Sequence, residues 1–127
     1  MEMKKIYRCS VCGNIVVQIH EGGGELVCCH QPMTLLTANT TDAATEKHVP
    51  VIELNGNKLV VKVGDVEHPM TAEHYIQWIM VVQGEHTQRI ELTPEDKPTA
   101  EFTVKENTPF VVYEYCNLHG LWKAESK

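Results

Sequence analysis

The fold is decided by the stretch Tyr75-Ile76-Gln77-Trp78-Ile79-Met80-Val81-Val82-Gln83, which is apolar on both of its faces. A strand with this pattern lies inside a sheet that is covered on both sides. The stretch is also much shorter than the roughly 20 apolar residues that a membrane-spanning helix needs. It therefore predicts a central β-strand and argues against a membrane protein.

Shorter strand patterns surround this stretch on both sides. Residues 49–54 and 58–63 flank Asn55-Gly56-Asn57, which is typical of a tight hairpin turn. Residues 86–92 alternate between two faces, and residues 101–105 and 110–115 complete the set, with prolines between them. The sequence shows no long helical period and no internal repeat. Short strands at roughly even spacing predict an antiparallel β-sandwich or barrel.

Residues 1–36 and 37–127 differ in composition and are predicted to be separate domains. The first segment holds four of the five cysteines, a short apolar strand at 15–19 and a glycine run at 22–24. Chains below about 40 residues usually need a metal, disulfides or a partner, because they bury too little apolar surface to fold alone. The first domain is therefore expected to depend on a bound metal.

The four cysteines of that segment form the first predicted metal site: Cys9, Cys12, Cys28 and Cys29. Four thiolates suit the tetrahedral coordination of one ion. Gly13 follows the Cys-x-x-Cys pair and permits the left-handed backbone of a metal-binding turn. The adjacent pair can share the ion only through a distorted turn, because neighbouring side chains tend to point apart. Four sulfurs alone do not distinguish iron from zinc.

Four histidines and the fifth cysteine form the second predicted site: His48, His68, His74, Cys116 and His119. The Cys-x-x-His spacing of the last two is typical of metal ligands, and imidazole with thiolate suits Fe(II), copper or zinc. Five ligands are too many for tetrahedral zinc, whereas an iron site accepts five and leaves a sixth position open for a small molecule. The remaining histidines are expected to be surface or supporting residues: His20, His30 and His86.

The net charge of −6 is carried entirely by residues 37–127, because the acidic and basic side chains of residues 1–36 cancel. An acidic chain is not a general nucleic-acid binder, which would need a basic face. The N-terminus lacks the apolar segment of a secretory signal, and the odd cysteine count fits a reducing compartment. We therefore expect a cytoplasmic protein that binds neither nucleic acid nor membrane.

These motifs resemble the desulfoferrodoxin family over essentially the whole chain. The resemblance rests on Cys9-x-x-Cys12 with Cys28-Cys29, on Glu46-Lys47-His48-Val49-Pro50, on His68-Pro69-Met70 with His74, and on Cys116-Asn117-Leu118-His119-Gly120-Leu121-Trp122. It implies a mostly β chain, with a small desulforedoxin-like or rubredoxin-like metal-knuckle domain at 1–36 and an immunoglobulin-like antiparallel β-sandwich at 37–127. It also implies two non-haem iron ions. One is an Fe(Cys)4 centre, and the other has the four histidines equatorial and Cys116 axial.

The resemblance further implies a superoxide reductase, which adds one electron and two protons to superoxide and gives hydrogen peroxide. Reduced rubredoxin would be the usual electron donor, and the chain would form a homodimer. Glu46 is the implied sixth ligand of the oxidised iron, since a carboxylate is a hard donor suited to Fe(III). Because superoxide is an anion and the second domain is acidic, attraction must be local, and Lys47 beside His48 is the candidate to supply it.

Two other functions compete with this one. An electron-transfer protein with two iron centres and no catalysis of its own would explain the four-cysteine site, but it leaves the open position and Lys47 without a role. A zinc-stabilised binding module would explain the first domain and the sandwich but not the five-ligand set. Visible colour separates these functions, because ferric thiolate centres absorb visible light and zinc protein is colourless.

Overall fold

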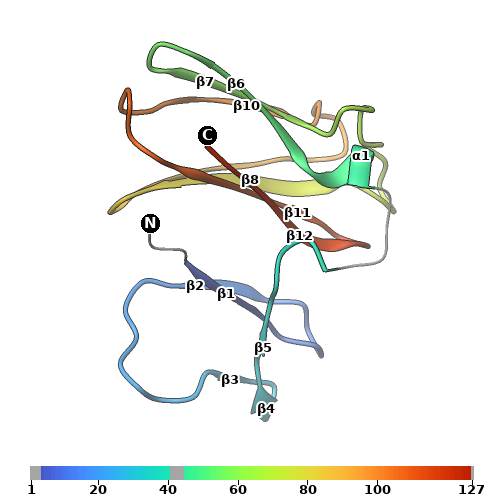
Figure 1. Ribbon diagram of the computed structural model, residues 1–127. Helices are drawn as coiled ribbons and strands as arrows, with labels where there is room; N and C mark the ends of the chain where they lie inside the picture. Colours follow the sequence, from blue (N-terminus) through green and yellow to red (C-terminus); the bar gives the residue numbers. More distant parts are fainter. Residues whose placement is uncertain (1–3, 41–44, 127) are drawn as a thin grey trace. The chain divides into compact units, whose positions relative to one another are not determined.

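The computed structural model of the chain describes residues 4–40 and 45–126, apart from the side chain of Glu46. The described residues form two compact units, one extending to Thr37 and the other starting at Ala38 (Figure 1). Strands and turns make up both units, and the one short helix within the described ranges is α1 (Thr45–His48). No helix in these ranges has the length and apolar character needed to cross a membrane. The predicted mostly β character is confirmed.

The first unit is built on a three-stranded antiparallel sheet with the order β2-β1-β5. Its strands are β1 (Lys5–Arg8), β2 (Ile15–Gln18) and β5 (Thr34–Leu35), and a separate hairpin joins β3 (Val27–Cys28) to β4 (Gln31–Pro32). Among the described apolar side chains of this unit, Ile6 and Cys9 are the buried ones. A core of that size is too small to hold the unit together without further support.

The second unit consists of two antiparallel sheets that enclose one core (Figure 1). Its strands are β6 (Pro50–Asn55), β7 (Lys58–Val63), β8 (Ile76–Gln83), β9 (His86–Glu91), β10 (Thr99–Thr103), β11 (Val111–Cys116) and β12 (Gly120–Glu125). The three-stranded sheet has the order β10-β7-β6, and the four-stranded sheet has the order β12-β11-β8-β9. This arrangement confirms the predicted antiparallel sandwich.

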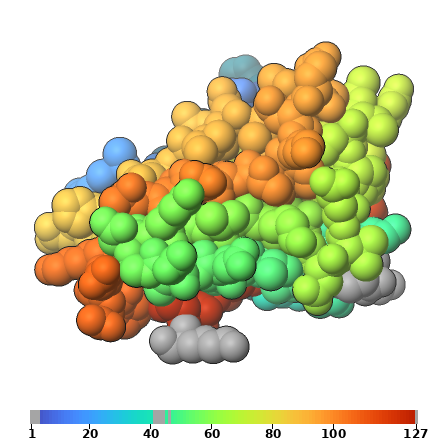
Figure 2. Space-filling view, turned by 90° about the horizontal axis from the view of Figure 1, so that it is seen from above, coloured from blue at the N-terminus to red at the C-terminus, as the bar shows by residue number. Residues whose placement is uncertain are grey.

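Figure 2 looks onto the outer face of the three-stranded sheet, where β6 and β7 (green) lie beside β10 (orange). Alternate side chains of β7 and β10 are exposed on this face, among them Lys58, Lys62 and Glu101. The side chains between them are buried and point into the sandwich. The alternation is what a sheet with one solvated face requires.

Strand β8 is the central element of the second unit, as its sequence predicts. It pairs with β11 on one side and with β9 on the other, and every residue of the strand except Gln77 is buried. Its side chains Ile79 and Val81 join Leu59 and Val61 of β7 in the core between the sheets. Each buried side chain of this size stabilises the fold by about 1.5–3 kcal/mol.

The other strands follow the sequence predictions with small differences. The β6–β7 hairpin turns at Gly56, whose φ of 65° lies in the left-handed region that glycine adopts readily. Strand β10 begins at Thr99 rather than at residue 101. The sequence does not predict β1, the two-residue strands β3, β4 and β5, or β12. Strand β12 forms because residues 120–125 pair with β11 along its whole length.

A β-bulge lies where β11 leaves the sandwich core. Tyr115 of β11 pairs with Trp78 of β8, but the next residue, Cys116, pairs with Ile76, so Gln77 is an extra residue. A bulge re-aims the side chains beside it, and both Ile76 and Cys116 belong to the buried core cluster. The loops that carry the predicted ligands of the second site meet at this end of the sandwich.

Candidate metal centres

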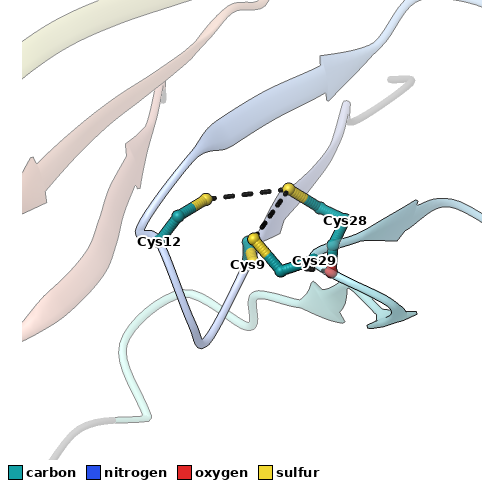
Figure 3. A group of neighbouring side chains, drawn as sticks. All are labelled: Cys9, Cys12, Cys28 and Cys29. Carbon is teal, nitrogen blue, oxygen red and sulfur yellow. Dashed lines mark hydrogen bonds between the residues drawn. The ribbon is translucent and has the colours of Figure 1, made fainter.

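The four cysteines of the first unit converge from two turns of the chain (Figure 3). Cys9 and Cys12 lie in the turn that follows β1, and Cys28 and Cys29 belong to the β3–β4 hairpin. Two backbone hydrogen bonds close the first turn, from the Cys9 N–H to the Asn14 carbonyl and from the Gly13 N–H to the Cys9 carbonyl, both 2.9 Å. Gly13 has a φ of 81°, which confirms the predicted left-handed position.

The adjacent pair Cys28-Cys29 sits on a tight turn with an unusual backbone. Cys29 and His30 connect β3 to β4, and both have positive φ values, 53° and 66°. Two left-handed residues in a row make a type I′ hairpin turn, which usually contains asparagine or glycine because other residues adopt this conformation less readily. This turn brings the two neighbouring Sγ atoms to 3.9 Å. The predicted distorted turn is therefore confirmed.

The spacing of the four sulfurs fits one tetrahedral ion. The Sγ atoms of Cys12 and Cys28 are 3.6 Å apart, those of Cys28 and Cys29 are 3.9 Å apart, and all four lie within 4.8 Å of one another. Four sulfurs at about 2.3 Å from a common ion would be separated by about 3.8 Å at tetrahedral angles.

The pKa values of these thiols also indicate that a bound cation is needed to ionise all four. The Cys12 backbone N–H lowers the pKa of Cys9 to about 6, whereas hydrogen bonding with the Cys12 thiol raises the pKa of Cys29 to about 12. Near pH 7 the cluster therefore does not ionise fully on its own. A metal ion that displaces the remaining protons would hold all four as thiolates.

The structure brings together all five residues predicted for the second site. His48 ends α1, His68 and His74 lie between β7 and β8, and Cys116 and His119 bound the turn between β11 and β12. The ligand atoms of the first three histidines and of Cys116 lie within 4.8 Å of one another. The Nδ1 atom of His119 is 3.1 Å from Nε2 of His48 and 3.9 Å from Sγ of Cys116.

The four imidazole rings of this site stand at the corners of a near-square. Neighbouring ring centroids are 4.7 Å (His48–His68), 4.6 Å (His68–His74), 5.0 Å (His74–His119) and 4.8 Å (His119–His48) apart, and the His48–His74 diagonal is 6.4 Å. Neighbouring ring planes meet at 74–85°. Rings set edge to face in this way can all point a nitrogen at the centre of the square.

The distances between the nitrogen atoms distinguish a square arrangement of ligands from a tetrahedral one. Nε2 of His48 is 3.1 Å from both Nε2 of His68 and Nδ1 of His119. Two nitrogens at about 2.1 Å from a common ion are about 3.0 Å apart at a right angle and about 3.4 Å apart at the tetrahedral angle. The measured distances therefore favour right angles. The thiol that completes the set, that of Cys116, is buried in the core.

Burial favours the neutral form of two of the imidazoles, those of His68 and His74, and the neutral form is the one that binds metals. Burial lowers the pKa of His68 to about 4, and it also lowers the pKa of His74, to which the positive charges of His119 and Lys47 add. Burial raises the pKa of the Cys116 thiol, and hydrogen bonds from the backbone N–H groups of Leu118 and His119 oppose this effect.

Further residues, which the sequence motifs do not assign, hold these rings in place. The Pro69 carbonyl accepts a hydrogen bond of 2.7 Å from the Nδ1–H of His68, so Nε2 of that ring is free to bind an ion. Trp122 stacks on His48, with ring centroids 4.9 Å apart and planes at 22°. Its Nε1–H also donates to the His119 carbonyl at 3.0 Å. Trp122 belongs to the quoted C-terminal motif, but its role appears only once β12 pairs with β11.

Glu114 is a third residue that the sequence motifs do not assign. It lies two residues before Cys116 on the same face of β11, and its side chain is fully buried. Neither carboxylate oxygen has a hydrogen-bond partner in the described part of the chain. Burial raises the pKa of this carboxyl well above its usual range, so it favours the neutral form. The period-2 alternation of β11 is the signal that could have placed it in the core.

The two predicted residues outside the ligand sets lie on α1. Lys47 is exposed and directly precedes the buried ligand candidate His48. The side chain of Glu46 lies outside the described part of the structure. The three histidines expected at the surface are exposed: His20, His30 and His86.

The chain is similar to known proteins over nearly its whole length. Residues 40–125 match the family described as Desulfoferrodoxin, and residues 1–36 match Desulfoferrodoxin, N-terminal domain. A desulfoferrodoxin homolog from Methanothermobacter thermautotrophicus is 54% identical over 121 residues, which cover 95% of this chain and 98% of the homolog.

Solved structures of superoxide reductases also match. That from Treponema pallidum has a TM-score of 0.77 and 32% identity, and the match covers 97% of this chain and 99% of the other. A superoxide reductase (1Fe-SOR) from Giardia intestinalis has a TM-score of 0.59 and 32% identity, and its match covers 65% of this chain and 98% of its own.

Proposed function

We propose that this chain, which belongs to the desulfoferrodoxin family, is a superoxide reductase. In this reaction superoxide takes up one electron and two protons and gives one hydrogen peroxide. The observation that carries the proposal is the near-square of four imidazoles with the Cys116 thiol on its core side. Similarity to a superoxide reductase that covers 97% of the chain supports it.

Two donor sets in the chain are consistent with the two iron centres of desulfoferrodoxin. We assign the first iron to Cys9, Cys12, Cys28 and Cys29, and the second to His48, His68, His74, His119 and Cys116. Iron in the second set would supply the transferred electron and an open coordination position for a small molecule. We propose residues 1–36 and 37–127 as the domains that hold these ions, in keeping with the two compact units.

The Cys116 thiolate favours reduction over dismutation. Thiolate donates electron density to its ion more strongly than imidazole does, which favours passing an electron to superoxide over removing one from it. The backbone N–H groups of Leu118 and His119 stabilise the charged sulfur by hydrogen bonding. A reductase of this kind needs an external electron donor.

Lys47 would attract the anionic substrate to the site. Lys47 directly precedes the buried ligand candidate His48, and its positive charge contributes to the lowered pKa of His74. The whole chain carries a net charge of −6, so its long-range field repels superoxide. A unit charge about 4 Å away interacts by about 4 kcal/mol at an effective dielectric constant near 20, which is enough to outweigh that field locally.

Glu46 is proposed as the sixth ligand of the oxidised iron. It lies two residues before His48 in the chain. A carboxylate is a hard oxygen donor, which suits Fe(III) better than Fe(II). Binding in one oxidation state and release in the other would leave the open position free when the reduced enzyme meets its substrate.

We also propose a rubredoxin-type electron donor, a homodimer and a cytoplasmic location. The exposed thiols Cys12 and Cys29 support electron entry through the first centre. Val16 of β2 and Ile19 just after it are 38% and 88% exposed, and such an apolar edge suits a second copy of the chain. The five cysteines are free thiols, which fits a reducing compartment.

A stopped-flow experiment on the reduced, iron-loaded protein tests the proposed function. Mixing with superoxide should consume it and yield one hydrogen peroxide for each superoxide, without dioxygen, while the colour of a ferric thiolate centre develops. Dioxygen release with half that yield of peroxide would indicate a dismutase instead. If superoxide disappeared no faster than in buffer, the result would favour an electron-transfer protein without catalysis of its own.

A further inference from the structure

Asn117 lies between two ligand candidates, Cys116 and His119, but its side chain is bonded to a different loop. Its Oδ1 accepts a hydrogen bond from the backbone N–H of Tyr75 at 2.9 Å, and its Nδ2 donates to the carbonyl of Glu73 at 3.0 Å. These two backbone groups stand on either side of His74. The side-chain amide therefore clamps the backbone around a third ligand candidate.

The chemistry of the clamp calls for an asparagine. A backbone N–H can only donate and a carbonyl can only accept, so the side chain must present one acceptor and one donor together. Aspartate offers acceptors alone, and leucine offers neither. The orientation of the amide group of Asn117 follows from its two partners, Tyr75 and Glu73.

The hydrogen bonds of Asn117 extend the pairing of β11 with β8 into the loops that carry the ligand candidates. The last pair between β11 and β8 joins Cys116 to Ile76, just beyond the bulge. The backbone N–H of Asn117 then bonds to the Tyr75 carbonyl at 3.2 Å. With its two side-chain bonds, Asn117 adds three links from the segment of Cys116 to the loop of His74.

The remaining bonds of that loop are local. Thr71 and His74 exchange two backbone hydrogen bonds of 2.9 and 3.2 Å, and the Thr71 hydroxyl bonds to the same residue. These bonds shape the turn that carries His74, but they do not fix its position relative to Cys116. Asn117 provides that connection.

We propose that Asn117 is a positioning residue, which sets the distance and orientation between the His74 imidazole and the Cys116 thiolate and thereby the affinity of the second site for its ion. The inference rests on the proposed function only in treating these two residues as ligands of one ion. Partners that orient metal ligands typically contribute 10–100-fold in metal affinity.

The test compares Asn117→Ala and Asn117→Asp with Gln83→Ala in the iron-loaded full chain. Gln83 is a matched control, because its side-chain amide makes three hydrogen bonds of 2.8–3.0 Å to Lys105 and Thr108. It ends β8, about 23 Å along the strand from Ile76. Three quantities are measured: iron release from each centre to a chelator, the absorption band from Cys116 to ferric iron, and the melting temperature.

Asn117→Ala should release the second iron about 10-fold faster and shift the absorption band, while the first centre in the same chain releases its iron at the wild-type rate. Asn117→Asp, which keeps the bond from Tyr75, should fall between Asn117→Ala and the wild type. Gln83→Ala should lower the melting temperature without changing either property of the second iron.

Two results would overturn the inference. One is an Asn117→Ala protein that melts at a lower temperature but keeps the wild-type iron release and absorption band, which would make the clamp purely structural. The other is equal acceleration of iron release in Gln83→Ala, which would indicate general loosening of the sandwich. Iron release and the absorption band are measured without turnover. If the wild-type chain did not reduce superoxide, the proposed function would be wrong, but the comparison of Asn117→Ala with Gln83→Ala would still test the role of Asn117.

Discussion

The two metal centres of this chain differ in what holds their ligands in place. In the first unit the thiols stand on two turns, and the buried apolar side chains of its described residues are Ile6 and Cys9. In the second unit the ligands stand at the ends of strands over a continuous core. From this difference we expect the first fold to depend on its ion and the second to form without one.

The same contrast appears in the protonation of the ligands. At the first centre the pKa values of Cys9 and Cys29 are about 6 and about 12, so a metal must displace protons to form four thiolates. At the second centre burial lowers the pKa values of His68 and His74, so these rings are already neutral at pH 7. The second centre is therefore preorganised for binding and the first is not.

The largest expected effect is the loss of the first unit on removal of one of its thiols. Cys12→Ser should unfold that unit, because a structural metal contributes an apparent 10–16 kcal/mol, more than so small a core can replace. Amide hydrogen exchange should show protection lost up to residue 37 and kept in β6–β12. Val11→Ala, at an exposed position between two of the thiols, is the control. If both units of the Cys12→Ser protein unfolded together, the second unit would not be stable independently of the first ion, contrary to this prediction.

Substitution of the second-site thiol should abolish activity without unfolding. Cys116→Ser keeps the size of a buried side chain but replaces the thiolate by a weaker donor, so the rate of superoxide reduction should fall by about 100-fold or more. Stopped-flow kinetics on the iron-loaded protein measures the rate, and circular dichroism checks the fold. The same change at Cys29 should leave that rate within a factor of about two, since it removes a ligand of the other centre only.

Loss of the Lys47 charge should slow the encounter with superoxide. Lys47→Ala should lower the second-order rate constant by about 10-fold at low salt and flatten its dependence on ionic strength, because local attraction of an anion is screened by salt. Iron content should stay at the wild-type level. Lys58→Ala is the control, since Lys58 pairs with Glu101 at 3.5 Å and stands at the far end of β6 and β7. If both variants lowered the rate constant equally, the effect would come from the net charge of the protein and not from the position of Lys47.

The smallest expected effect is a pH dependence of the metal-free second unit. The pKa of His68 is lowered from its ordinary 6.5 to about 4 in the fold, so the unfolded chain binds its proton first. Stability is therefore complete above pH 6.5 and falls as the pH drops toward 4. The melting temperature, followed by the fluorescence of Trp78 and Trp122, should decrease by about 10 °C or more over this range. His68→Gln should reduce the decrease and leave the smaller part that comes from His74, whose pKa is also lowered, whereas the exposed His86→Gln should not change it.

Local signals in the sequence were enough to predict much of the fold. The stretch around Trp78 is apolar on both faces, and the composition of the turn at Gly56 is typical of hairpins. The five candidate ligands of the second site were also recognisable, because Cys116 and His119 have ligand spacing and the histidines cluster near strand ends. The structure brings these five side chains together.

What the sequence did not predict depends on contacts between distant segments. Strand β12 needs β11 beside it, and the bulge at Gln77 appears only when β8 and β11 are aligned. The stacking of Trp122 on His48 joins residues far apart in the chain. Glu114 stands inside the sandwich although its residue type suggests a surface position. Residue types and spacing carry no information on such pairings.

The turn at Gly56 has a practical use. It lies at the opposite end of β6 from His48, about 17 Å along the strand. Gly56 and its neighbours Asn55 and Asn57 are exposed. A fluorescent label or a surface linker attached there would leave the donor set untouched, which makes this corner a suitable handle for single-molecule or immobilised-protein measurements.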